Sequence, residues 1–236
     1  IGLKPTTVDE CFELTVTAIK YSEKYRVQVI VDPDEVVGHM RENYFLPRPG
    51  EIEIVDRLEP SGPVEDYKPF NFNDGAVAPL APFGSPYISH ITSSMHGEDG
   101  YSDNSPDNAR RRVSQLHLKL ENNLDDIVLT RAFDLDDCET LIVAVGSAVR
   151  AARAAAKEGR QKGLKVGVLQ IITMWPFPEK ELIEAAAKVK KVVVPEMNYA
   201  GQLAGEVARV LPKIKIDRVR SFNGQMITPA DILVSL

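Results

Sequence analysis

The sequence predicts an α/β protein with a mostly parallel, doubly wound sheet. From Cys138 onward, short apolar runs alternate regularly with helical patterns, an alternation that is typical of parallel strands with helices on both faces. The apolar runs are nearly continuous, as strands buried on both faces require. We therefore expect a doubly wound domain at 138–236, preceded by a partial α/β unit at 1–40 and a long connector at 41–137.

The first predicted element is a helix over 7–24. Thr7-x-x-Glu10 fits a capping box, and the predicted apolar face consists of Val8, Phe12, Val16 and Ile19. The β-branched run "RVQVIV" at 26–31 predicts a strand that stops at Asp32-Pro33. A helix and one strand are only the end of an α/β unit. We therefore expect the chain, which does not begin with Met, to be the later part of a longer polypeptide.

The connector is predicted to be mostly irregular, because prolines, glycines and aromatic residues interleave from about Gly38 to Ser105. A segment of this kind inside a compact protein is usually functional or interdomain. One helix is expected near 106–122, where Ser105 is a good N-cap and Pro106 fits the first helical position. Its predicted apolar stripe consists of Ala109, Val113, Leu116 and Leu120.

The last third of the chain has the clearest periodicity. A short final helix is announced by Thr228-Pro229-x-Asp231. Before it, strands are predicted at 140–145, 165–172, 191–195 and 214–219, and helices at 147–158, 179–188 and 200–211.

Composition excludes several classes of protein. A formal net charge of -6 argues against wrapping of nucleic acid, which needs clustered Lys and Arg. No apolar run is long enough to cross a bilayer and the start lacks signal-peptide features, so we expect a cytoplasmic protein. The two cysteines, Cys11 and Cys138, are too few and too far apart for a zinc site, a disulfide framework or an iron–sulfur cluster of their own.

In an open α/β sheet, ligands bind beyond the carboxyl ends of the strands. Gly146-Ser147 lies there but lacks the glycines of a dinucleotide fingerprint. We interpret Ser147 as an N-cap whose hydroxyl accepts a helix N–H; the alternative is an anion site at the same helix N-terminus. Two further segments at this edge, "MWPFPEKE" (174–181) and "EMNYAGQ" (196–202), supply the candidate interface residues Trp175, Phe177, Glu196 and Asn198.

These aromatic side chains have a simpler interpretation as packing residues, although Trp is enriched in interface cores. A basic series on the helix after Ser147 fits a solvated face or the docking of an acidic partner. It consists of Arg150, Arg153, Lys157, Arg160 and Lys162.

The loop "HITSSMHGEDGYSD" at 90–103 concentrates histidines and acids, but its spacing matches neither a zinc helix nor a calcium loop. Turn formation explains its composition. We interpret His39 and His117 as hydrogen-bonded structural histidines, with His117 on the apolar side of its helix. Since no catalytic triad, nucleophile elbow or purposeful carboxylate pair is found, we expect no catalytic, cofactor-binding or metal residue in this chain.

Several stretches together resemble the alpha subunits of 2-oxoacid:ferredoxin oxidoreductases, especially the 2-oxoglutarate type. They follow the family's order: "VIVDPDEVVGHMRE" (29–42), "HITSSMHGEDGYSDNSPDN" (90–108), "VGVLQIITMWPFPEKEL" (166–182), "VVVPEMNYAGQLAGEV" (192–207) and "NGQMITPADIL" (223–233).

The resemblance implies that 1–40 is the tail of the domain that binds the pyrimidine end of thiamine diphosphate, and that 138–236 is like the C-terminal domain of transketolases. It further implies a holoenzyme that uses thiamine diphosphate, Mg²⁺, [4Fe-4S] clusters and coenzyme A, with a beta subunit and ferredoxin as partners. In the family the diphosphate, Mg²⁺ and cluster ligands lie on partner chains or domains, so this segment is expected to be structural and inactive alone. The alternatives are the tail of a non-redox thiamine enzyme, of transketolase or E1-beta type, and a small-ligand binding module.

Overall fold

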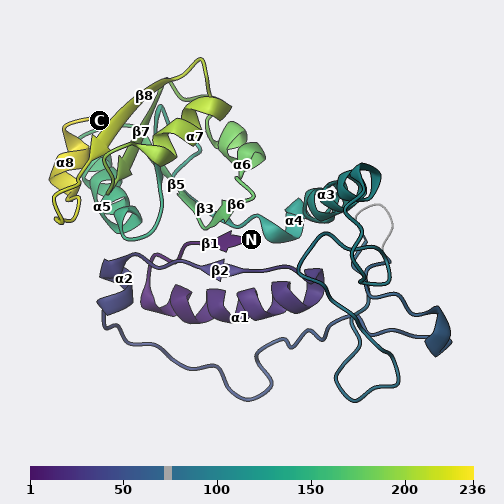
Figure 1. Ribbon diagram of the computed structural model, residues 1–236. Coiled ribbons are helices and arrows are strands. Elements are labelled where there is room, and N and C mark those ends of the chain that lie inside the picture. The colour runs from purple at the N-terminus through teal and green to yellow at the C-terminus, as the bar shows by residue number, and fades with distance from the viewer. Residues whose placement is uncertain (72–75) are drawn as a thin grey trace. The chain divides into compact units, whose positions relative to one another are not determined.

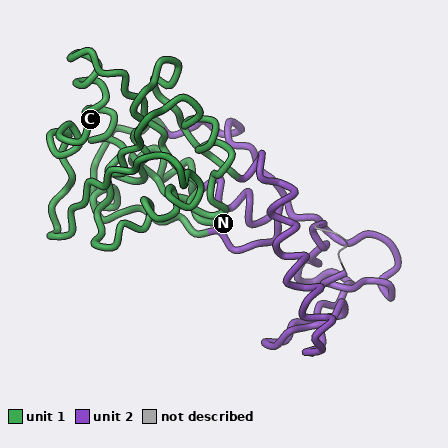
Figure 2. The backbone as a smooth tube through the Cα atoms, turned by 90° about the horizontal axis from the view of Figure 1, so that it is seen from above, with its two compact units in different colours: residues 1–15, 30–45, 128–236 green, residues 16–29, 46–127 purple. Residues whose placement is uncertain are grey.

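The computed structural model describes residues 1–71 and 76–236, and its helices and strands are labelled in Figure 1. The chain forms two compact units, shown in different colours in Figure 2. Unit 1 comprises 1–15, 30–45 and 128–236, and unit 2 comprises 16–29 and 46–127. The division of the sequence into domains at 1–40, 41–137 and 138–236 stays a prediction.

Unit 1 is built on a five-stranded sheet of order β3-β5-β4-β7-β8. Strands β4, β5, β7 and β8 are parallel, whereas β3 pairs antiparallel with β5 at the edge. The predicted mostly parallel sheet is therefore confirmed, with β3 as an addition, because its sequence "TRAF" lacks an apolar run. The strands are β3 (Thr130–Phe133), β4 (Thr140–Ala144), β5 (Val166–Ile171), β7 (Lys191–Glu196) and β8 (Lys215–Arg220).

Helices cover both faces of this sheet. Alternate side chains of β4 belong to different core clusters: Leu141 lies in the cluster shared with α6 and α7, and Ile142 in the cluster shared with α5 and α8. This alternation is the two-residue period of a strand buried on both faces, and it confirms the doubly wound arrangement (Figure 1). The helices are α5 (Ala148–Gln161), α6 (Glu179–Ala185), α7 (Gln202–Val210) and α8 (Pro229–Leu233).

A second, small sheet in unit 1 has the order β2-β1-β6. Strand β1 (Gly2–Leu3) runs parallel to β2 (Ile30–Val31) and antiparallel to β6 (Thr173–Trp175). Only the last two residues of the predicted strand "RVQVIV" are thus paired. The helix α2 (Glu35–His39), which was not predicted, follows β2.

Helix α1 (Val8–Tyr25) forms where the sequence predicted it, but it buries a different face. The predicted apolar residue Ile19 is 63% exposed. The buried face consists of Glu10, Leu14, Ala18, Tyr21 and Tyr25. Two of these are tyrosines, whose rings bury much apolar area, so the amphipathic pattern of aliphatic residues alone was misleading.

Unit 2 is mostly irregular, as predicted. Its regular elements are the end of α1, a 3₁₀ turn at Val64–Asp66, α3 (Pro106–Glu121) and α4 (Leu124–Ile127). The predicted start of α3 is confirmed, because the Ser105 hydroxyl accepts the Asn108 N–H at 3.4 Å.

The predicted apolar stripe of α3 is wrong: Val113 and Leu116 are 49% and 51% exposed, and of the stripe only Leu120 is buried. The helix instead buries a polar face of Asn108, Arg112, Gln115 and Lys119.

This reversal has a physical cause in the irregular chain of unit 2. An irregular segment leaves backbone carbonyls without ladder partners, and buried carbonyls need donors. The polar face of α3 supplies them: Asn108 donates to the carbonyl of Asp103 at 2.8 Å, Arg112 to that of Phe70 at 2.6 Å and Lys119 to that of Arg26 at 3.0 Å.

None of the helices in the described part of the chain is long and apolar enough to cross a membrane.

Candidate functional site

The carboxyl edge of the five-stranded sheet is the place to look for a ligand site. At the turn from β4 to α5, Gly146 has a φ of +55° and Ser147 begins the helix. The Ser147 N–H donates to the Asp34 carboxylate at 2.7 Å. The other oxygen of Asp34 accepts the Val37 N–H at 3.0 Å, at the start of α2. One carboxylate therefore accepts one backbone N–H at the start of each of two helices.

The interpretation of Ser147 as a hydroxyl cap is wrong. Its backbone is already helical, with φ -59° and ψ -26°, and its hydroxyl makes no cap hydrogen bond; a hydroxyl cap needs an extended backbone at that residue. The hydroxyl is buried without a hydrogen-bond partner within residues 1–71 and 76–236. A Cβ atom on Gly146 would lie 2.5 Å from Asp34 Oδ2, so the carboxylate lies directly against this turn and takes the place that the alternative interpretation gave to an external anion.

A second carboxylate holds the first turn of α7. Glu196 is 3% exposed and accepts the backbone N–H groups of Leu203 and Ala204 at 2.9 and 3.1 Å. Asn198 donates to Glu196 at 2.7 Å and accepts the Gly201 N–H at 2.6 Å. These two residues thus shape the loop between β7 and α7. Their predicted part in an interface stays a prediction.

The aromatic candidates of this edge differ in exposure. Trp175 ends β6 and is 51% exposed. Phe177 is partly buried and packs against the core cluster shared by α6 and α7. Trp175 therefore offers the larger accessible aromatic surface, and an interface role for either residue stays a prediction.

A buried polar network in unit 1 joins α1 to the five-stranded sheet, and the sequence did not reveal it. The Glu10 carboxylate accepts the Thr6 N–H at 2.8 Å, Arg131 of β3 at 2.8 Å and the Gln170 amide of β5 at 3.0 Å. Only half of the predicted capping box forms: the Thr7 hydroxyl accepts the Glu10 N–H at 3.3 Å, but the Glu10 carboxylate accepts the N–H of Thr6 in place of that of Thr7. The sequence did contain one clue to this network. Gln170 is a polar residue inside the apolar run of β5, and a buried amide needs hydrogen-bond partners.

The loop at 90–103, in unit 2, uses its acidic groups for turns and ion pairs. Glu98 contacts Arg111 at 2.9 Å and Lys68 at 3.4 Å, and Asp103 accepts the Ser105 N–H at 3.0 Å. Outside residues 72–75, no group of three His, Cys, Asp or Glu side chains gathers that could hold a metal ion.

The two histidines interpreted as structural differ in outcome. His39 Nδ1 lies 2.9 Å from the Glu35 carbonyl, within hydrogen-bond distance. His117 lies on the aliphatic side of α3, but that side, with Val113 and Leu116, is exposed, so the interpretation of His117 as a structural histidine finds no support among the described residues. The reversal of that helix accounts for the difference.

The two helix N-termini at the sheet edge do not fit a diphosphate, and the two cysteines do not fit an iron–sulfur cluster. The N-termini of α5 and α7 each hold an internal carboxylate, which would repel a phosphate. Cys138 is buried and donates to the Thr140 carbonyl at 3.0 Å, and burial raises the pKa of both Cys11 and Cys138. Two separated thiols are also too few for a cluster, which normally takes four thiolates.

Two family models match the chain. Residues 1–115 match a model described as pyruvate flavodoxin/ferredoxin oxidoreductase, thiamine diphosphate-binding. Residues 138–232 match a model described as pyruvate:ferredoxin oxidoreductase core domain II.

Curated relatives and a solved structure agree with these models. The chain is 37% identical over 235 residues to the 2-oxoglutarate synthase subunit KorA of Methanothermobacter marburgensis, covering 99% of this chain and 62% of the relative. It is 39% identical to the subunit of the same name from Methanocaldococcus jannaschii, covering 98% of this chain and 62% of the relative. A 2-oxoglutarate:ferredoxin oxidoreductase from Magnetococcus marinus, solved with 2-oxoglutarate, coenzyme A and succinyl-CoA bound, aligns with a TM-score of 0.88 at 28% identity, covering 100% of this chain and 41% of that one. The chain thus spans about three fifths of the length of these curated relatives.

Proposed function

Since the chain belongs to the 2-oxoacid:ferredoxin oxidoreductase family, we propose that it is part of the alpha subunit of an enzyme that converts a 2-oxoacid to an acyl-CoA and passes the electrons to ferredoxin. The favoured substrate is 2-oxoglutarate. The similarity to subunits of 2-oxoglutarate synthases over nearly the whole chain carries this proposal.

The assembled enzyme is proposed to use thiamine diphosphate with Mg²⁺, [4Fe-4S] clusters and coenzyme A. The thiamine diphosphate-binding family model and the coenzyme A-bound structural relative support two of these groups. Because Asp34 and Glu196 occupy the two helix N-termini at the sheet edge, we place the diphosphate on other parts of the enzyme. The cluster ligands are placed there too, since this chain has only two cysteines.

The described residues of this chain are proposed to brace the assembly. In unit 1, Glu10 and Asp34 connect residues 1–15 and 30–45 to the five-stranded sheet and α5, through contacts of their side chains with the Gln170 amide and the Ser147 backbone N–H. These contacts hold the segment that contains β1 and β2 in a defined position on unit 1. The rest of a cofactor domain is proposed to be positioned through its connection to this segment.

Unit 2 is proposed to contact the beta subunit. It exposes large apolar side chains that water solvates poorly, among them Ile54, Phe83, Ile88, Val113 and Leu116, and extensive exposed apolar surface marks sites of protein association. Ferredoxin is reached through the holoenzyme, and we propose a cytoplasmic location for the whole.

The test is an assay of 2-oxoglutarate-dependent reduction of a viologen dye with coenzyme A and thiamine diphosphate present. We expect no turnover from this chain alone. Turnover should appear when the remaining alpha segment and the beta subunit are added. Clear turnover by the chain alone would defeat the structural role, and failure of 2-oxoglutarate in a complete complex that turns over another 2-oxoacid would defeat the substrate assignment.

A further inference from the structure

Helix α5 carries a stripe of four cations in a chain whose formal net charge is -6. The stripe follows helical spacing, so its members share one side of the helix: Arg150, Arg153, Lys157 and Arg160. Like charges at such spacings repel one another and destabilise a helix. An anion that binds along the stripe would remove this repulsion.

The stripe borders a groove in unit 1 of about 530 Å³. Thr6, Thr7, Phe133 and Asp134 also line it, and Asp134 is the single acidic residue among the lining residues that the structure describes. Its apolar lining residues are Ala154, Ala156 and Val168, in addition to Phe133. Small-molecule sites combine such apolar walls with a few charged groups, in volumes of about 300–1,000 Å³.

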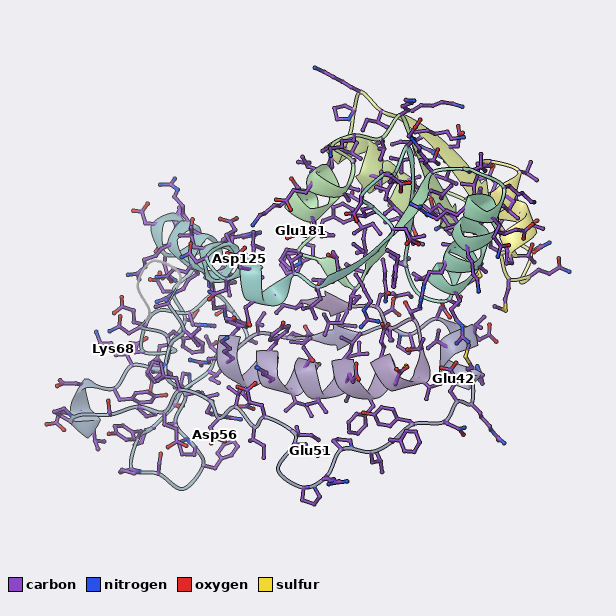
Figure 3. The ribbon with its side chains drawn as sticks, turned by 180° about the vertical axis from the view of Figure 1, so that it is seen from behind. Glu42, Glu51, Asp56, Lys68, Asp125 and Glu181 are labelled. Atoms are coloured by element: carbon purple, nitrogen blue, oxygen red, sulfur yellow. The ribbon has the colours of Figure 1, made fainter. Side chains whose placement is uncertain are left out.

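Two of the four cations already have carboxylate partners. Arg150 contacts Glu42 at 2.6 Å; Glu42 is labelled in Figure 3, beyond the end of α2. Arg160 contacts Asp137 at 2.6 Å. The charges at the two ends of the stripe are therefore balanced by carboxylates of the chain itself.

The two central cations differ. Among the residues that the structure describes, no carboxylate lies in ion-pair contact with Arg153 or Lys157. The Arg153 guanidinium lies over the Phe133 ring, 4.2 Å from its centroid. This cation–π contact holds the guanidinium at the groove and uses none of its N–H donors on a carboxylate. Lys157 lies four residues further on, one helical turn away.

We propose that this groove binds a soluble organic phosphate of nucleotide size. Arg153 and Lys157 contact the phosphate: the guanidinium suits two phosphate oxygens at once, and the ammonium adds a compact positive charge. The apolar wall of Phe133, Ala156 and Val168 accommodates the organic part. Neither Asp34 nor Ser147 lines the groove, which begins on α5 at Arg150, so this binding goes beyond the proposed function of the holoenzyme.

The test is isothermal titration calorimetry of the chain with ADP, adenosine and inorganic phosphate at low salt. We expect ADP to bind, phosphate to bind more weakly and adenosine to give no heat, because the phosphate carries the attraction and the groove is larger than a bare anion. Arg153→Gln or Lys157→Gln should each weaken ADP binding about tenfold, the loss of one charge-assisted contact. Added NaCl should weaken ADP binding to the unsubstituted chain.

The matched control is Lys188→Gln, which removes one charge from an exposed position of unit 1. This variant should bind ADP like the unsubstituted chain. Absence of heat with both ADP and phosphate, equal weakening by Lys188→Gln, or equal binding of ADP and adenosine would each overturn the proposal. Circular dichroism of the variants confirms that any loss is not a loss of fold.

Discussion

The Asp34 carboxylate links residues 113 positions apart in the sequence when it accepts the Ser147 N–H. Neither α2 nor its Asp34 cap was predicted from the sequence, and the longer contact could not be, because no periodicity relates positions so distant. By its residue type and its place before α5, Ser147 was the expected cap of that helix. A charged oxygen from another segment accepts the Ser147 N–H itself, while the Ser147 hydroxyl makes no cap hydrogen bond.

Substitutions at these two residues should therefore have opposite outcomes. Asp34→Ala should lower the free energy of unfolding by about 2 kcal/mol, because two helix starts lose their acceptor. Ser147→Ala should change it by less than about 0.5 kcal/mol, because the hydroxyl caps nothing. Urea denaturation measures both, with Asp32→Ala, at an exposed ion pair with Lys4, as the control. If Ser147→Ala lowered the free energy of unfolding by about 1 kcal/mol or more, the Ser147 hydroxyl would be acting as a helix cap after all.

Lys119 gives unit 2 a dependence on pH. The residue is 5% exposed, and burial, followed by the nearby Arg26 charge, lowers its pKa from 10.5 to about 8. Between these two values the unfolded chain holds more protons on this group, so the free energy of unfolding rises with pH across this window.

The measurement is the difference in unfolding free energy between the unsubstituted chain and Lys119→Met, determined from pH 7 to 10.5. We expect the difference to shift by on the order of 2 kcal/mol in favour of the unsubstituted chain as pH rises. Comparison with the variant cancels the titration of tyrosines such as Tyr21, whose pKa burial and Asp126 raise to about 12. If this difference did not vary with pH, it would contradict the lowered pKa of the buried Lys119 ammonium.

At the scale of elements, helix α3 shows how context reverses an amphipathic pattern. Its aliphatic stripe predicted a buried side, yet its polar side lies inward because the surrounding irregular chain presents carbonyls. The elements after Cys138, apart from the short strand β6, were predictable to within a few residues, since β4, β5 and β7 are nearly continuous apolar runs. Strand β3 and helix α2 were missed because they are short and partly exposed.

Two leucines of α3 test the reversal. Leu120→Ala should lower the free energy of unfolding by about 2 kcal/mol or more, because Leu120 is 5% exposed. Leu116→Ala, at a position 51% exposed, should change it by less than about 0.5 kcal/mol. Urea denaturation followed by circular dichroism measures both. Equal losses in the two variants would show that the aliphatic stripe is buried after all.

Gly167 lies in β5, where the chain segment at 134–138 packs closely against its backbone. A Cβ atom there would lie 2.9 Å from the Asp134 carbonyl oxygen and 3.0 Å from Cys138 Sγ. Gly167→Ala should therefore lower the free energy of unfolding by about 1–3 kcal/mol through overpacking. Gly205→Ala, in α7 with open space around its Cβ position, is the control and should be neutral or stabilising. A neutral Gly167→Ala would show that the loop above β5 can move aside.

At the scale of the whole molecule, the two units differ in how they are held together. Both hydrophobic core clusters consist of residues from unit 1. Unit 2 relies on side chain to backbone hydrogen bonds around α3 and a smaller set of buried apolar residues. Composition and periodicity predicted the doubly wound sheet but not this contrast, because irregular chain has no period to detect.

Hydrogen exchange followed by mass spectrometry should show the contrast directly. Amides of β4, β5 and β7 should exchange most slowly, because their opening requires both core clusters to open. Amides of 46–63 and 76–104 should exchange within seconds to minutes. Addition of the beta subunit should slow exchange in unit 2 if that unit is its contact surface. Slow exchange throughout unit 2 in the chain alone would contradict the inference that unit 2 is held together less tightly than unit 1.

The double cap by Asp34 also bears on how the chain tolerates changes of length. The hydrogen bond from Ser147 closes a loop that contains most of unit 2. The entropy lost on closing a flexible loop grows only with the logarithm of its length, about 0.6 kcal/mol per doubling. Insertions or deletions in the irregular stretch at 46–63 should therefore leave the closure at Asp34 almost unchanged in free energy, and that stretch can vary in length between related proteins while the sheet of unit 1 keeps its register.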